Sequence, residues 1–156
     1  PDPAGECDLS LLPVASLAGP VVKIKTVDPG THISYGWHYT TRCRTKIATV
    51  HAGYAHGLPR YMSNKGEIVL NGSHYTIAGN VTMDYCMVDI GEQSAVAVGD
   101  TALCLGALGE HAVSIDAVAR EGNTIGYEVL CNLGRSIDRL VIQGGRVVTR
   151  YPATLL

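Results

Sequence analysis

The sequence predicts a mainly β domain, a barrel or sandwich of short strands with one short helical insertion. Three observations support this. Short alternations of apolar and polar residues recur along most of the chain, turn-forming residues separate them, and a helical pattern occurs in one region only. The 156 residues suffice for one domain with its own core, and contents of 46% hydrophobic and 17% charged residues are typical of a globular chain.

The first strand is predicted at residues 21–27, where apolar and polar residues alternate up to the turn Asp28-Pro29-Gly30. Residues 1–20 are rich in Pro and Gly and lack a period, so we expect an extended linker there. The pair Asn71-Gly72 suits the type I′ turn of a β-hairpin. The other expected strands are 46–54, 66–70, 73–78, 87–90, 101–105, 139–143 and 146–150, the last two joined across Gly144-Gly145.

The helical pattern is confined to residues 114–130. Ser114 is expected to cap a helix over 115–121, which stops at Gly122. Thr124 is expected to cap a second short helix that ends at Leu130.

Composition argues against several classes of function. The net charge is −2 and the 12 basic residues are spread out, so a nucleic-acid partner is not expected. No apolar run approaches the roughly 18 residues of a membrane span, and no signal-peptide pattern begins the sequence. Five cysteines without a C-x-x-C pair indicate reduced thiols in the cytoplasm. The six histidines show no metal-ligand spacing, so no metal site is expected.

Four short segments place polar or aromatic residues beside glycines within β patterns. Taken one at a time, each has an ordinary structural interpretation, because tyrosines are common at strand ends, Met83 suits a core and Asp84 suits a turn. The segments are Ser34-Tyr35-Gly36, Gly53-Tyr54-Ala55-His56-Gly57, Thr82-Met83-Asp84-Tyr85-Cys86-Met87-Val88-Asp89 and Thr124-Ile125-Gly126-Tyr127-Glu128-Val129.

In this order and at these separations, the segments resemble the C-terminal β-domain of the alanine racemases, which depend on pyridoxal 5′-phosphate (PLP). That family reads S-Y-G, then G-Y-A-D-G, then C-M-D-x-x-M-V-D and T-I-N-Y-E-V, and Tyr35 and Tyr54 have the family's separation of 19 residues. The resemblance extends from the linker through residue 150. It implies that residues 1–20 are the crossover from a missing N-terminal PLP-binding barrel and that residues 21–156 are the β-domain.

The resemblance also implies a function. Family members are head-to-tail homodimers, in which the β-domain of one subunit closes the site on the barrel of the other. Two bases on opposite faces of a planar carbanion interconvert L- and D-alanine on a PLP Schiff base, which supplies D-alanine for peptidoglycan. Tyr35 matches the tyrosine that exchanges the Cα proton of the L-enantiomer, and a barrel lysine serves the D-enantiomer.

Four further residues acquire roles from the same resemblance. Met83 matches the residue whose backbone amide contacts the substrate carboxylate, and Asp84 matches the aspartate that orders this loop. Tyr54 matches a tyrosine that narrows the access channel to the substrate. Tyr127 matches a tyrosine that hydrogen-bonds the PLP phosphate.

Tyr35 needs assistance to act as a base. A free tyrosine has a pKa near ~10, so about one in a thousand is ionised at pH 7, and a neighbouring cation or hydrogen-bond donor must help. In the family, a histidine–arginine chain on the barrel provides that help. The four lysines of the chain are Lys23, Lys25, Lys46 and Lys65, and each is expected to be solvated. We therefore expect the chain alone to be inactive until a racemase barrel, in cis or in trans, completes the site.

The sequence departs from the family pattern at several positions. His56 replaces the usual Asp of G-Y-A-D-G, and His51-Ala52 replaces a Pro-aliphatic pair. Thr82 stands where Cys is usual, and Gly126 where Asn is usual. The tyrosines are untouched, so the reaction type is expected to be kept, but preference for serine or another small amino acid stays open.

Two other functions stay open at this point. The chain would also suit a non-enzymatic β-barrel module for binding or assembly, descended from such a domain. The matching domain of a PLP-dependent amino-acid decarboxylase shares the architecture, although the S-Y-G and M-D-x-x-M-V-D patterns favour a racemase.

Overall fold

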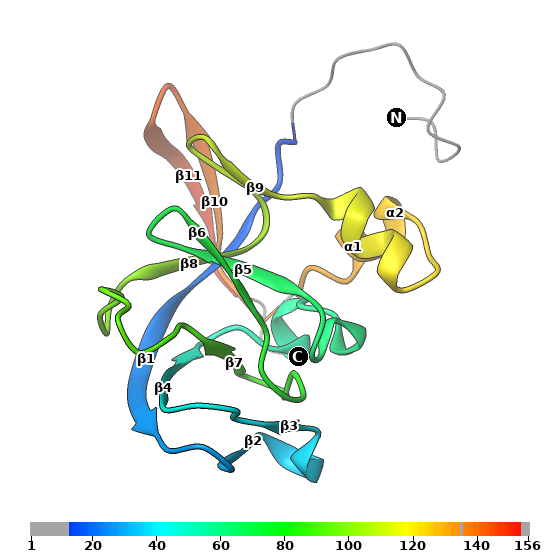
Figure 1. The fold of residues 1–156 in the computed structure, drawn as a ribbon. Coiled ribbons are helices and arrows are strands. Elements are labelled where there is room, and N and C mark those ends of the chain that lie inside the picture. Colours follow the sequence, from blue (N-terminus) through cyan, green and yellow to red (C-terminus); the bar gives the residue numbers. More distant parts are fainter. Residues whose placement is uncertain (1–12, 135, 154–156) are drawn as a thin grey trace.

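The computed structural model describes residues 13–134 and 136–153, and its centre is a seven-stranded antiparallel sheet (Figure 1). The strands lie in the order β6 (Ser73–Thr76), β5 (Glu67–Leu70), β8 (Thr101–Leu108), β1 (Leu17–Val27), β4 (Thr45–Val50) and β7 (Cys86–Asp89), and β9 (His111–Val113) pairs with β8. The two ends of this order meet, because Ile77 forms a bridge with Val88 and the Ala78 N–H donates to the Met87 carbonyl at 2.8 Å. The sheet is therefore nearly closed, which confirms the predicted barrel-like fold.

Strand β1 is long enough to serve two neighbours. Its first part pairs with β8 and its second part with β4, and the register shifts between Val21 and Lys23. Such a bulge bends and twists a strand, which lets one strand turn from one neighbour to the next. The strand begins at Leu17, four residues before the predicted start, so the sheet starts within the segment 1–20 expected as a linker. Residues 1–12 lie outside the described residues.

Strand β4 is shorter than predicted. It ends at Val50, whereas the alternating pattern predicted a strand over 46–54. Tyr54 instead begins the short 3-10 helix η2 (Tyr54–His56), and its N–H donates to the Thr82 carbonyl at 3.0 Å. The prediction was wrong here because a loop distant in sequence takes the hydrogen bond that a strand neighbour would have taken.

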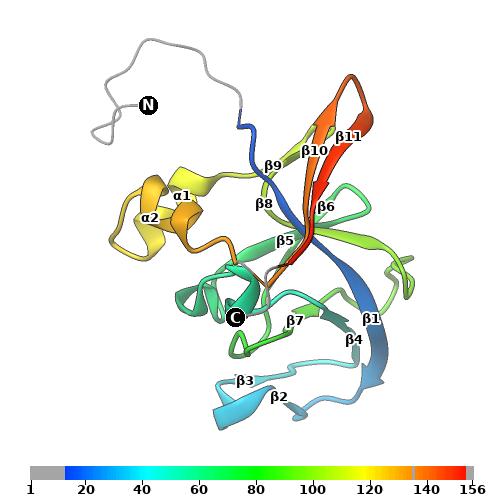
Figure 2. The same ribbon diagram turned by 180° about the vertical axis from the view of Figure 1, so that it is seen from behind.

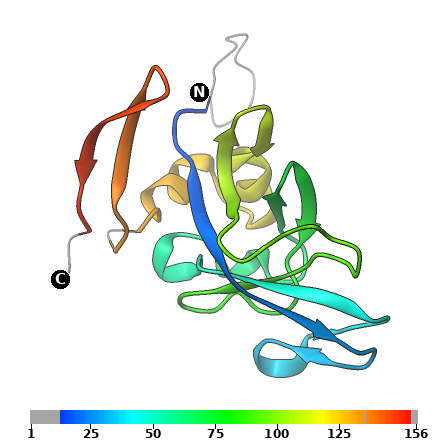
Figure 3. The same cartoon turned by 90° about the vertical axis from the view of Figure 1, so that its left-hand side faces the viewer.

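Two glycine turns behave as predicted. Asn71 and Gly72 have φ values of 48° and 79°, as a type I′ turn between β5 and β6 requires. Gly144 and Gly145, with φ values of 56° and 74°, join β10 (Arg139–Gln143) to β11 (Arg146–Tyr151). This second hairpin forms its own two-stranded sheet, set apart from the larger sheet in Figure 3. A third small sheet, β2 (His32–Ile33) with β3 (Tyr39–Thr40), was not predicted.

Two helices lie together at one side of the sheet (Figure 2). Helix α1 (Ile115–Glu121) is confirmed, and the Ser114 Oγ accepts the Ala117 N–H at 3.3 Å as its cap. Helix α2 (Gly126–Cys131) begins after Ile125, which occupies the N-cap position. The predicted Thr124 cap is wrong, because the Thr124 hydroxyl donates to the Glu128 carboxylate instead. Among the described residues, no helix has the length and hydropathy of a membrane span.

The core lies inside the curled sheet and extends beneath α1 and α2. Its largest fully buried aliphatic side chains come from several elements: Val21, Val50, Leu58, Ile68, Leu70, Ile77, Val81, Val88, Leu103, Leu105 and Val129. Each such side chain contributes about 1.5–3 kcal/mol by leaving water. Cys86 and Cys104 belong to this core as free thiols, and Cys43 and Cys131 are free thiols at the surface. Ala52 and Val81, which lie in the loops after β4 and before β7, also belong to this core, so the core anchors these loops.

Candidate active site

Tyr35 is presented by a clamped loop between β2 and β3. It begins the short 3-10 helix η1 (Tyr35–Trp37), and it is 77% exposed. Ser34, just before it, has a φ of 64°, a left-handed conformation that a serine adopts only when its surroundings impose it. The Ser34 Oγ donates to the Asn80 carbonyl at 2.8 Å. In return, the Asn80 Nδ2 donates to the Tyr35 carbonyl at 2.9 Å.

A second asparagine, Asn64, also holds the loop that carries Tyr35. The Asn64 Nδ2 donates to the His38 carbonyl at 3.0 Å, and its Oδ1 accepts the Gly79 N–H at 2.6 Å. Gly79 has a φ of 85°, and a Cβ there would lie 2.6 Å from the Ile33 carbonyl oxygen. Only glycine permits this close approach. The backbone of Tyr35 is therefore fixed while its side chain points outward.

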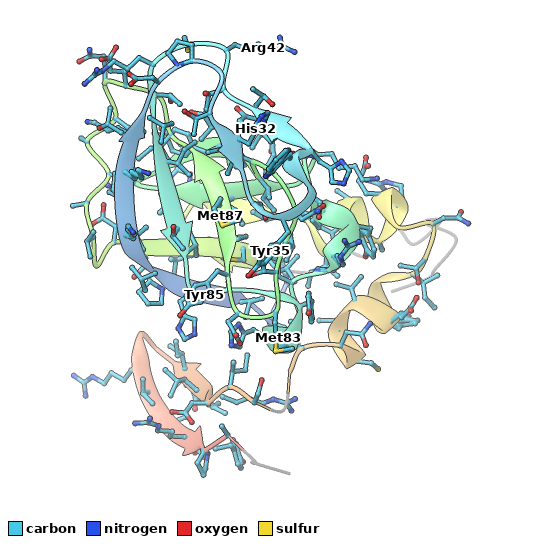
Figure 4. The ribbon with its side chains drawn as sticks, turned by 90° about the horizontal axis from the view of Figure 1, so that it is seen from below. His32, Tyr35, Arg42, Met83, Tyr85 and Met87 are labelled. Carbon is cyan, nitrogen blue, oxygen red and sulfur yellow. The ribbon has the colours of Figure 1, made fainter. Side chains whose placement is uncertain are left out.

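A cavity of about 350 Å³ opens beside Tyr35. Figure 4 shows Tyr35, Tyr85 and Met83 at the same edge of the domain. The residues that line the cavity are Ser34, Tyr35, Thr49, Thr82, Tyr85 and Met87. Among the described residues, this lining of hydroxyls, rings and one thioether contains no lysine or arginine. The described lining therefore supplies hydrogen-bonding groups and apolar surface but no positive charge.

The predicted residues Tyr54 and Met83 are tied together by their backbones. The Ala55 N–H donates to the Met83 carbonyl at 3.0 Å, beside the bond from Tyr54 to Thr82. Gly53 makes this approach possible, since a Cβ there would lie 2.2 Å from the Met83 carbonyl oxygen. The Met83 N–H donates no hydrogen bond to any residue in the described part of the chain. It is thus available at the position where the resemblance expects a substrate carboxylate.

Two histidines, His51 before the Tyr54 turn and His56 at its end, contact each other. The His56 Nδ1 accepts the Gly53 N–H at 3.0 Å, and the rings of His56 and His51 meet edge to face with centroids 5.0 Å apart. His51 also lies against the Tyr85 ring at 5.3 Å. Burial lowers the pKa of His56 below its ordinary value, the His51 charge lowers it further, and Asp84 opposes the shift. His56 is therefore held in its neutral form near pH 7.

The structure places the five predicted residues in two groups. Tyr35 itself lines the cavity. Tyr54, Met83 and Asp84 lie on the joined segments 53–55 and 82–85, which line the cavity through Thr82 and Tyr85. Tyr127 lies on α2 and is not among the described residues that line the cavity. The segment after α2 nevertheless reaches the Tyr54 turn, because the Ser136 Oγ donates to the Ala55 carbonyl at 2.8 Å.

Sequence reasoning missed the residues that hold the site. Asn80 lies 45 positions from Tyr35, and Asn64 lies 26 positions from His38. No local pattern announces such pairs. One signal was available for Asn80. It follows Gly79 in a turn-forming pair, and its side-chain amide can donate two hydrogen bonds close to the segment 82–89.

The fold and the cavity together define a barrel-like β-domain with an aromatic site at one edge. The family model described as the C-terminal domain of alanine racemase matches residues 14–141. The alanine racemase of Clostridium kluyveri is 36% identical over 149 residues, which are 94% of this chain and 38% of that protein. That of Halothermothrix orenii is 39% identical over 132 residues, 85% of this chain and 35% of that protein.

Solved structures agree with the sequence relatives. The alanine racemase of Clostridium difficile 630 in complex with cycloserine superposes with a TM-score of 0.85 at 35% identity, covering 94% of this chain and 38% of that one. The enzyme from Bacillus anthracis with bound L-Ala-P gives 0.81 at 34% identity, covering 88% and 35%. The chain therefore belongs to the alanine racemase C-terminal domain family, as its four segments predicted. It spans a little over a third of the length of these relatives.

Proposed function

We propose that this domain supplies Tyr35 as one of two proton carriers in a racemase that interconverts L- and D-alanine. The observation that carries the proposal is the contrast at Tyr35 between a clamped backbone and a side chain that is 77% exposed. Tyrosines usually bury most of their ring. A phenol held out on a fixed loop suits a group that must reach a substrate on another domain, where positioning lowers the barrier to proton transfer.

The loops beside Tyr35 bind and enclose the substrate in this proposal. The Met83 N–H donates to the substrate carboxylate, and the Met83 carbonyl is already held by Ala55. Tyr54, 45% exposed at the start of η2, narrows the access channel. Asp84 keeps the Met83 loop in order. The small cavity favours a substrate with a short side chain, alanine first and serine as the second candidate.

The described residues fit the rim of a PLP site. Tyr127 is 45% exposed on α2, and we assign the PLP phosphate to it. Lys65 pairs with Glu121, and Lys46 donates to the Ser94 carbonyl. Lys23 and Lys25 are exposed on β1, so we assign the lysine that binds the cofactor to the barrel domain. PLP, when bound, withdraws the electron pair that is left on the substrate Cα. Tyr35 then accepts or returns the Cα proton at its Oη, on the face opposite the barrel's base.

The rest of the proposal concerns the complete protein, since this chain spans 38% of the C. kluyveri relative. In this proposal the complete protein is a homodimer in which a barrel domain completes the site, and this chain alone is inactive. D-alanine made by the complete protein would serve peptidoglycan synthesis. The free thiols of the four described cysteines support a reducing compartment such as the cytoplasm.

A chimera tests the proposed function. The part of the C. kluyveri alanine racemase that this chain matches is replaced by the chain, and D-alanine formation from L-alanine is measured. We expect racemisation by the chimera and a loss of about 10²–10⁴-fold in kcat with Tyr35→Phe, the range for removing a general acid–base group. Tyr75→Phe, which lies on β6 away from the cavity lining, is the control. Equal activity of the Tyr35→Phe chimera and its parent would refute the assignment.

A further inference from the structure

The backbone of Gly53 makes three hydrogen bonds that hold the turn 53–58. Its carbonyl accepts the His56 N–H at 3.0 Å and the Leu58 N–H at 3.2 Å. Its own N–H donates to the His56 Nδ1, also at 3.0 Å. The turn that follows holds the carbonyls of Thr82 and Met83 through two backbone bonds. Whatever orients Gly53 therefore also orients the loop of the predicted substrate contact.

The bond at Nδ1 constrains the protonation of His56. An imidazole nitrogen that accepts a hydrogen bond carries no proton, so the neutral ring has its proton on Nε2. Full protonation places a second proton on Nδ1, directly opposite the Gly53 N–H. Two donors then face each other at the distance of a hydrogen bond, and the bond is lost.

The surroundings of His56 favour the accepting form. From the end of β4, the His51 ring meets it at 83° with centroids 5.0 Å apart, so a charge on both rings would be repulsive. From the loop 82–85, Asp84 acts in the opposite direction, and Tyr85 contacts His51 rather than His56. On the third side, residues 132–134 and Ser136 carry no charge, and the Gly134 N–H donates to the His56 carbonyl at 3.1 Å.

We propose that His56 is a positioning residue whose neutral imidazole locks the Tyr54–Ala55 turn onto the Met83 loop, with His51 as the neighbour that disfavours its protonation. The inference deepens the proposed function and rests on it for the role of the Met83 loop. His56 does not touch the substrate. It acts through the Gly53 N–H, and the lock opens when His56 takes up a second proton.

A carboxylate is the matched alternative to this imidazole. An aspartate at position 56 also accepts a hydrogen bond, and it stays ionised down to a pH of about 4. His56→Asp is therefore expected to keep the lock through the range in which His56 titrates. His56→Ala removes the acceptor altogether. His51→Gln keeps the acceptor and removes the neighbouring charge, so the midpoint of the His56 titration is expected to rise.

NMR of the 156-residue chain tests the proposal without any activity measurement. With ¹⁵N-labelled histidine and glycine, we expect His56 in the Nε2–H form at pH 7.5 and a Gly53 amide resonance that titrates with the same midpoint as His56. The protection factors of the Tyr54 and Ala55 amides are expected to fall about fivefold on protonation, as for the loss of one hydrogen bond. They should stay constant in His56→Asp and be low at every pH in His56→Ala.

Two results would overturn the proposal. One is a Gly53 amide that does not follow the His56 titration, and the other is a His56→Asp chain that behaves like His56→Ala. Both are read from the domain itself, so they are independent of whether the chimera racemises alanine. An inactive chimera with an intact His56 lock would count against the proposed function alone.

Discussion

Gly53→Ala should separate the two loops that form the predicted substrate contact. Gly53 has an ordinary extended φ of −140°, so alanine is tolerated by the backbone itself. Its Cβ would nevertheless lie 2.2 Å from the Met83 carbonyl oxygen and 2.4 Å from that of Thr82. Both obstacles are backbone atoms, which cannot rotate away. The loops must therefore move apart.

The cost follows from what this movement breaks. Two backbone hydrogen bonds, from Tyr54 and Ala55, are lost or stretched, at about 1 kcal/mol each. Crowding against a well-packed neighbour adds roughly 1–3 kcal/mol. The lower entropy of the unfolded alanine chain returns about 0.4–1 kcal/mol. The expected loss is therefore about 2–4.6 kcal/mol, and the melting temperature should fall by roughly 4–18 °C for a chain of this size.

Urea unfolding followed by circular dichroism measures this loss. Gly99→Ala is the matched control, because a Cβ there meets nothing within 4 Å although its φ is 97°. The control should lose about 1–2 kcal/mol from the left-handed backbone alone. Equal stability of Gly53→Ala and the parent chain would contradict the close contact between Gly53 and the loop 82–83.

Three further predictions concern single side chains. The Tyr61 hydroxyl is buried without a hydrogen-bond partner among the described residues, so Tyr61→Phe should leave the free energy of unfolding unchanged or raise it by up to about 1 kcal/mol; a clear loss in urea unfolding would contradict this. Burial and the hydrogen bond to Asp89 raise the pKa of Tyr39 to about 12, so its NMR resonances should still be those of a neutral phenol at pH 10, where an ordinary tyrosine is about half ionised. Because the pKa of His56 is lowered in the folded chain, the unfolded chain binds a proton at His56 first as the pH falls. The stability that neutral His56 contributes is therefore complete above about pH 6.5 and is lost below it. His56→Asp should lose less stability between pH 7 and pH 5, and equal losses in the two chains would show that His56 is not the source.

The parts of the fold that local chemistry decides were predictable. The Asn71-Gly72 hairpin follows from the backbone freedom of two residues, and α1 follows from Ser114 and its short amphipathic run. The strand predicted over 46–54 was too long, because the Tyr54 N–H donates to the Thr82 carbonyl instead of to a strand neighbour. No local sequence pattern reveals such a contact. Helix α2 was predicted near its observed position, but the Thr124 hydroxyl donates to the Glu128 carboxylate and does not cap the helix.

The candidate site divides in the same way. Tyr35 and Met83, the residues that we propose to contact a substrate, were predicted because the order and spacing of several short segments resemble a family. The residues that hold them were not, since Asn80 and Asn64 act across 45 and 26 positions. Three-dimensional closure of the sheet brings these partners together, and a single sequence does not encode that closure in any one window.

Exchange of the alanine Cα proton with solvent deuterium reports on the proposed role of Tyr35 in a single step. In the chimera, L-alanine and D-alanine are each incubated in D₂O, and deuterium at Cα is measured by NMR before racemisation is appreciable. If Tyr35 is the proton carrier for the L-enantiomer, Tyr35→Phe abolishes the exchange of L-alanine while D-alanine still exchanges through the opposite base. Undiminished exchange of L-alanine in the Tyr35→Phe chimera would contradict the account.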